Sequence, residues 1–182
     1  MDALTLRRRV RWLLGFFVVG LVISGLTAFP LVWEITILYR LMGSNTAVGH
    51  WWPAMSQWIS EVHQGLMDAN TDYPFLFYGT DWLAFAHIVM AVAFLGPLRN
   101  PVRNLWVIEF GMIACALVIP LALICGPLRG IPAFWRMIDC SFGVVGFFPL
   151  WLARKYVRRL SILENHPMAA AKLEITAPMD GQ

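Results

Sequence analysis

Long apolar blocks separated by short polar segments dominate the chain. The first block carries no charged residue from Trp12 to Trp33. A transmembrane helix needs about 20 such residues to cross the hydrocarbon core of a bilayer. Three further blocks follow, so the pattern predicts spans at residues 12–38, 79–98, 104–125 and 134–153. We therefore expect an all-α fold, an integral membrane bundle of four transmembrane helices.

Prolines lie inside three of these blocks. Pro30, Pro120 and Pro149 each lack an amide hydrogen, and the ring of each clashes with the preceding helical turn. We expect each of them to kink its helix near one membrane face.

The segment 39–78, between the first two spans, is too polar to cross the bilayer. Its apolar residues recur at spacings of three and four, which is typical of an amphipathic helix. The apolar face holds Trp51, Met55, Trp58, Ile59, Val62 and Leu66, and the opposite face holds Ser56, Gln57, Ser60, Glu61 and Gln64. Tryptophan favours the headgroup layer, so we expect an interfacial amphipathic helix here.

Composition agrees with a membrane location. Of the 182 residues, 59% are hydrophobic and 14% are charged, and the mean hydropathy is +0.64. Soluble domains carry about 25% charged residues. The net charge of +3 gives no indication of a nucleic-acid partner. The expected partner is the lipid bilayer, with other membrane subunits or a second copy of the chain as further candidates.

Lysine and arginine concentrate in three regions that four spans would place on one side. These residues are Arg7, Arg8, Arg9, Arg11, Arg99, Arg103, Arg154, Lys155, Arg158 and Arg159. Cytoplasmic segments carry the excess of basic residues, so we expect both termini to be cytoplasmic. The four-span domain covers residues 1–160, and residues 161–182 form a flexible cytoplasmic tail.

Five charged residues near the opposite side form the candidate site. They are Glu34, Asp81, Arg129, Arg136 and Asp139. Ionisable residues within a span are costly, which makes them functional candidates. Asp81 either caps the second span or pairs with Arg129 or Arg136. Arg136 and Asp139 are three residues apart on one helix and can pair with each other.

His87 is the one histidine within a predicted span. It forms an interhelical hydrogen bond, or it acts as a proton relay or a ligand of heme b. A heme needs a second axial ligand, and no second span carries a histidine. The remaining candidates are His63, His50, Met112 and Met137. No cysteine or histidine spacing indicates a metal site. Glu109 is expected to pair with Arg99 or Arg103.

Three stretches resemble a family of small four-helix bacterial inner-membrane proteins with no assigned activity. They are YPFLFYGTDWLAFAH (73–87), GPLRGIP (126–132) and WRMIDC (135–140). The resemblance covers most of the four-helix region and implies a location in the bacterial inner membrane. A looser resemblance to four-helix b-type cytochromes rests on helix count and His87.

Three functions are compatible with these features. The first is a non-enzymatic accessory, assembly or lipid-binding membrane protein, since no catalytic motif is present. The second is a redox subunit that holds heme b through His87. The third is an enzyme or transporter acting at the outer charged cluster. Small residues, namely Gly20 with Ser24 and Ser141 with Gly143 and Gly146, favour close helix packing or a homodimer.

Overall fold

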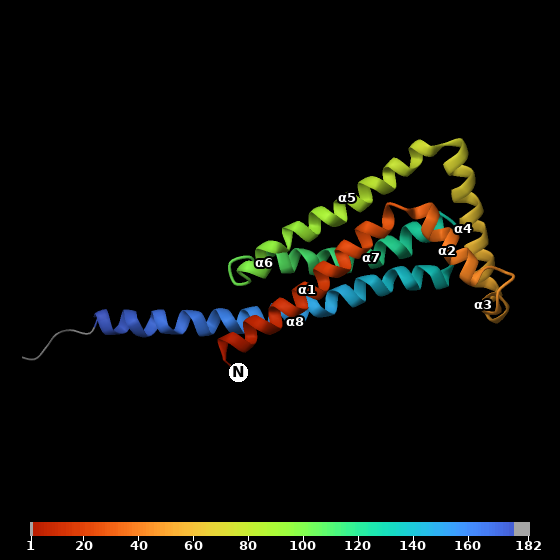
Figure 1. Cartoon of the computed structure of the whole chain (residues 1–182). Coiled ribbons are helices and arrows are strands. Elements are labelled where there is room, and N and C mark those ends of the chain that lie inside the picture. The colour runs from red at the N-terminus through yellow and green to blue at the C-terminus, as the bar shows by residue number, and fades with distance from the viewer. Residues whose placement is uncertain (1, 177–182) are drawn as a thin grey trace, which may run out of the picture. The chain divides into compact units, whose positions relative to one another are not determined.

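The computed structural model describes the backbone of residues 2–176 and the side chains of residues 2–164. Within these residues it contains helices and no strand (Figure 1). The elements are α1 (Ala3–Ala28), α2 (Leu31–Met42), α3 (Ala47–Trp51), α4 (Pro53–Asp72), the 3-10 helix η1 (Pro74–Phe77), α5 (Tyr78–Ala93), α6 (Leu95–Arg99), α7 (Leu105–Leu128) and α8 (Ala133–Thr176). The predicted all-α class is confirmed.

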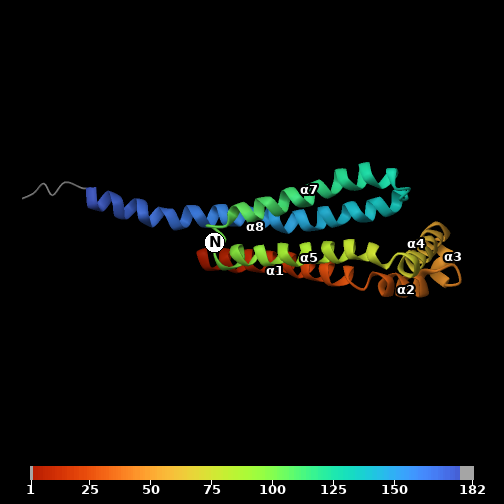
Figure 2. The same cartoon turned by 90° about the horizontal axis from the view of Figure 1, so that it is seen from above.

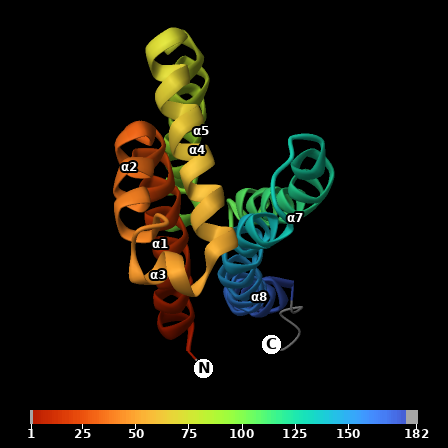
Figure 3. The ribbon, with the colours of Figure 1, turned by 90° about the vertical axis from the view of Figure 1, so that its right-hand side faces the viewer.

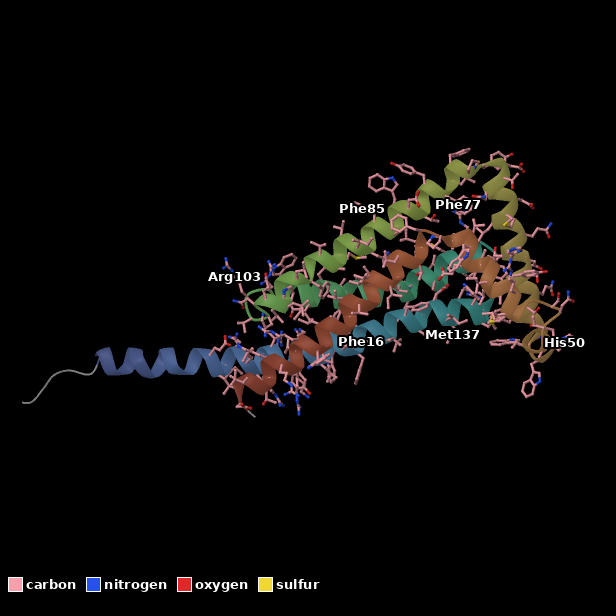
Figure 4. The ribbon with its side chains drawn as sticks, viewed as in Figure 1. Phe16, His50, Phe77, Phe85, Arg103 and Met137 are labelled. Atoms are coloured by element: carbon pink, nitrogen blue, oxygen red, sulfur yellow. The ribbon has the colours of Figure 1, made fainter. Side chains whose placement is uncertain are left out.

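Four helical stretches are long and apolar enough to cross a membrane. They are Ala3–Ala28, Pro74–Arg99, Leu105–Leu128 and Ala133–Glu164. At most 28% of the residues in their apolar windows are buried inside the protein. Large side chains such as Phe16 and Phe85 therefore remain exposed (Figure 4). A bilayer accommodates this apolar surface, so the chain has the helices of a multi-pass membrane protein.

The prediction of one helix over 12–38 is wrong. Helix α1 begins at Ala3, which makes the arginine cluster helical, and it ends at Ala28. Helix α2 begins at Leu31, and the amide of Glu34 donates to the carbonyl of Pro30 at 2.9 Å. Proline cannot donate the hydrogen bond that would join the two helices. Pro30 thus separates two helices instead of kinking one.

The last helix is longer than expected. Helix α8 continues past the predicted end of the fourth span at residue 153 and reaches Thr176. Val157 and Leu160 are fully buried, so packing supports this extension. The backbone of residues 161–176, expected as the start of a flexible tail, is helical. Residues 177–182 of that tail lie outside the described residues.

The chain divides into two compact units. Unit 1 contains, among the described residues, 2–18 and 93–176, and unit 2 contains 19–92. In unit 1, α7 packs along α8 (Figure 2). The most buried side chains of α1 and α8 in this unit recur at intervals of three and four residues. This spacing places them on one face of each of these two helices. They include Leu6, Val10, Leu14, Leu150, Ala153, Val157 and Leu160.

Glycine allows α8 to approach α7 closely. A Cβ atom on Gly143 would lie 2.6 Å from the carbonyl oxygen of Cys115. A Cβ atom on Gly146 would lie 2.9 Å from the Cys115 Sγ atom. Close packing at these two glycines agrees with the sequence prediction. By contrast, nothing lies within 4 Å of a Cβ on Gly20, and Gly25 is the glycine of α1 that packs against Ala84 of α5.

Glu109 pairs with α8, so the expected pair with Arg99 or Arg103 is not the one observed. Arg154 Nε donates to Glu109 Oε1 at 2.7 Å, and Arg158 Nη2 lies 3.5 Å from the same oxygen. The packing of α7 on α8 brings these residues together. All three side chains are at least 29% exposed, so each pair contributes about 1 kcal/mol or less.

In unit 2, α4 packs against α2 (Figure 3). The His63 ring stacks on Tyr39 with 4.5 Å between ring centroids. His63 Nε2 lies 3.3 Å from Thr36 Oγ1. The Thr36 hydroxyl donates to the Val32 carbonyl, so it accepts from the histidine. Met55 and Ile59 are buried, and Ser56, expected on the polar face, is buried as well.

Candidate functional site

The turn between α7 and α8 positions the first site residue, Arg129. Helix α7 ends at Leu128, and Gly130 follows with a φ of +71°. The amide of Ile131 donates to the carbonyl of Gly126 at 3.0 Å. This is the hydrogen bond of a Schellman motif, which requires a left-handed residue at the position of Gly130. Pro132 then precedes α8, so the local sequence itself fixes this corner.

A pocket of about 230 Å³ lies at this corner, between α7 and α8. Two of the predicted site residues, Arg129 and Asp139, line it. Its other lining residues are small or apolar: Val118, Leu121, Ala122, Cys125, Gly126 and Ile131. The pocket therefore combines an apolar wall with one positive and one negative side chain. Such a combination suits an amphiphilic ligand.

Arg136 lies beside this pocket. A Cβ atom on Gly126 would collide with Cγ and Cδ of Arg136, so the arginine occupies the space that this glycine leaves. The Nε atom of Arg136 is buried and has no hydrogen-bond partner among the described residues. A buried donor without a partner costs free energy. An acceptor supplied by a ligand would remove that cost.

The expected pair between Arg136 and Asp139 is absent from unit 1 as the structure describes it. The ion pairs of that unit join Arg7 to Glu164 and join Arg154 and Arg158 to Glu109. Arg136 packs against Gly126 of the neighbouring helix instead of running along its own helix toward Asp139. Tertiary packing thus replaces the local pair that the spacing of three residues allowed.

Glu34 and Asp81 belong to unit 2, whereas the other three predicted site residues belong to unit 1. Glu34 is exposed in the first turn of α2, and Asp81 is half-buried in the first turn of α5. In the same turn of α5, Thr80 donates its hydroxyl to the Phe77 carbonyl at 2.7 Å. The structure brings together Arg129, Arg136 and Asp139, and these three form the site considered below.

His87 bonds within its own helix. Its Nδ1 atom lies 2.8 Å from the carbonyl oxygen of Leu83, one turn earlier in α5. A Cβ atom on Gly25 would lie 3.2 Å from the Cβ of His87, so the histidine stands where α1 approaches α5 within unit 2. This intrahelical contact involves Nδ1, and the interhelical hydrogen bond, the proton relay and the heme ligand stay predictions for His87.

Sequence reasoning did not identify Gly126 as a site residue. The available signal is weak, since it consists of one small residue three positions before Arg129. Its importance arises from Arg136, which reaches it across the α7–α8 contact. Within the described residues, no group of three histidine, cysteine, aspartate or glutamate side chains is placed to hold a metal ion.

Comparison with known proteins adds no assignment to this geometry. No family model, no curated protein and no solved structure matches the chain.

Proposed function

We propose that this chain is a non-enzymatic accessory protein of the bacterial inner membrane that binds a phospholipid in the α7–α8 pocket. One observation carries the proposal, namely the buried Arg136 Nε without a partner, beside a pocket that Arg129 lines. Arginine is suited to phosphate, because its guanidinium presents several N–H donors in a fixed plane. The apolar residues of the pocket suit the glycerol and acyl part of the same molecule.

The position of the pocket, at the connected ends of α7 and α8, supports a lipid headgroup as its occupant. Arg129 directly follows the last residue of α7, and Asp139 lies in the second turn of α8. Both helices are candidate spans, so their connected ends belong near one membrane face. Phosphates of lipids lie at this level of a bilayer.

A binding measurement on two variants tests this function. We expect Arg136→Gln and Gly126→Ala each to weaken binding of a short-chain phospholipid about tenfold, the value of one charge-assisted hydrogen bond. The first variant removes the guanidinium, and the second displaces it, because the added methyl group occupies its place. Native mass spectrometry of the detergent-solubilised protein measures the bound fraction.

Arg103→Gln is the matched control, because Arg103 is exposed in the loop before α7 (Figure 4) and does not line the pocket. It should bind lipid as the parent chain does. A binding measurement with inorganic phosphate distinguishes a lipid site from a simple anion site. Phosphate has no apolar part that could contact the apolar wall of the pocket. Equal binding by the parent chain and both pocket variants would contradict the proposal.

We also propose that both termini face the cytoplasm and that α4 lies in the headgroup layer on the opposite side. The basic residues at both ends of unit 1 and the exposed Trp51 next to α4 support this orientation. In intact cells, Asn45→Cys should react with a membrane-impermeant maleimide above the background of the parent chain, and Asn100→Cys should not. The reverse labelling pattern would contradict this orientation.

A further inference from the structure

Asp139 is a carboxylate in a membrane-spanning helix without a partner in its own unit. It is half-buried in the second turn of α8 and lines the α7–α8 pocket. No hydrogen bond or ion pair joins it to another described side chain of unit 1. An ionised group at such a position is costly unless a counter-charge accompanies it. The pocket therefore has a place for a positive group.

Arg129 lines the same pocket and carries the opposite charge. The two side chains do not pair with each other in unit 1 as described. The pocket thus presents a separate site for an anion and a separate site for a cation, joined by an apolar wall. A ligand that satisfies both must carry a negative and a positive group close together on an apolar body.

We propose that the pocket selects phospholipids whose headgroup ends in a primary ammonium, as in phosphatidylethanolamine. The phosphate lies on Arg129 and on the unpartnered Nε of Arg136, and the ammonium lies on Asp139. This inference rests on the proposed function, because it assigns the headgroup of the same bound lipid. The ammonium matters because it carries three N–H donors for the carboxylate.

Two common headgroups lack this feature. The quaternary nitrogen of choline has no N–H group, so it offers Asp139 charge without a hydrogen bond. The glycerol headgroup has no positive charge, so its phosphate would leave the carboxylate without a counter-charge. Charge-assisted hydrogen bonds are about twice as strong as neutral ones, so the ammonium headgroup should be preferred.

The test compares three lipids with identical acyl chains: phosphatidylethanolamine, phosphatidylcholine and phosphatidylglycerol. Each is titrated into the detergent-solubilised full chain, and native mass spectrometry gives the bound fraction. We expect the parent chain to bind phosphatidylethanolamine about tenfold more tightly than either of the others. Asp139→Asn should abolish the preference and leave phosphate-dependent binding in place. Asp72→Asn, at an exposed aspartate of α4, should keep the preference.

The outcomes separate this inference from the function on which it rests. Equal binding of all three lipids, or an unchanged preference in Asp139→Asn, would overturn the headgroup assignment while lipid binding stands. Binding of none of the three would overturn the proposed function itself. Soluble phosphoethanolamine supplies the headgroup without the apolar body. If it bound as tightly as the lipid, the ligand would be a free phosphate ester and the lipid assignment would fail.

Discussion

Phe94→Ala should lower the free energy of unfolding of the protein by about 3 kcal/mol, the low end of the range for removing a buried aromatic ring. The Phe94 side chain is 1% exposed, and its ring centroid lies 4.8 Å from that of Phe17. Its Cζ atom would lie 2.6 Å from a Cβ atom on Gly111 of α7. The ring therefore fills space between segments of unit 1, and alanine leaves a cavity there.

We expect the low end of this range for Phe94→Ala because lipid also solvates an apolar side chain. The stability lost in the variant therefore comes from lost packing contacts. Denaturant titration in mixed micelles, followed by the fluorescence of the nine tryptophans, measures the change. Phe16→Ala is the matched control, because Phe16 is 61% exposed on α1 in the same unit. It should change the free energy of unfolding far less. Equal losses in the two variants would show that Phe94 is not a packed core residue.

Gly143→Ala should also be strongly destabilising, by about 2–3 kcal/mol, the upper part of the range for overpacking a well-filled interior. The new Cβ atom would lie 2.6 Å from the Cys115 carbonyl oxygen, which belongs to the backbone of α7 and has no rotamer to change. The two helices must separate to admit it. The same denaturant titration measures the loss.

Gly15→Ala gives the comparison for this second variant. Gly15 lies on α1 in unit 1, and nothing lies within 4 Å of a Cβ atom placed on it. Alanine favours the helix over glycine by about 1 kcal/mol, so Gly15→Ala should be neutral or stabilising. If Gly143→Ala were as stable as Gly15→Ala, α8 would not depend on Gly143 for its approach to α7.

The candidate site was predictable in part. Arg129, Arg136 and Asp139 are identifiable because charged residues are rare at the ends of such apolar blocks. Their arrangement was not predictable, since a spacing of three residues allowed an Arg136–Asp139 pair as readily as any other contact. The packing of Arg136 against Gly126 depends on how α7 lies on α8, which no local pattern specifies.

The sequence by itself determined the helical class and the approximate positions of the four helices that are long and apolar enough to cross a membrane, because these depend on the length and polarity of consecutive residues. It also determined the α7–α8 turn, where Gly130 and Pro132 impose a local geometry. Tertiary structure decided that Glu109 pairs with Arg154, that Gly25 instead of Gly20 packs on α5, and that Arg129 and Asp139 share one pocket. The first two contacts join residues far apart in the chain, and the third depends on how α8 lies against α7 after the turn, so all three follow from helix packing and not from spacing along the sequence.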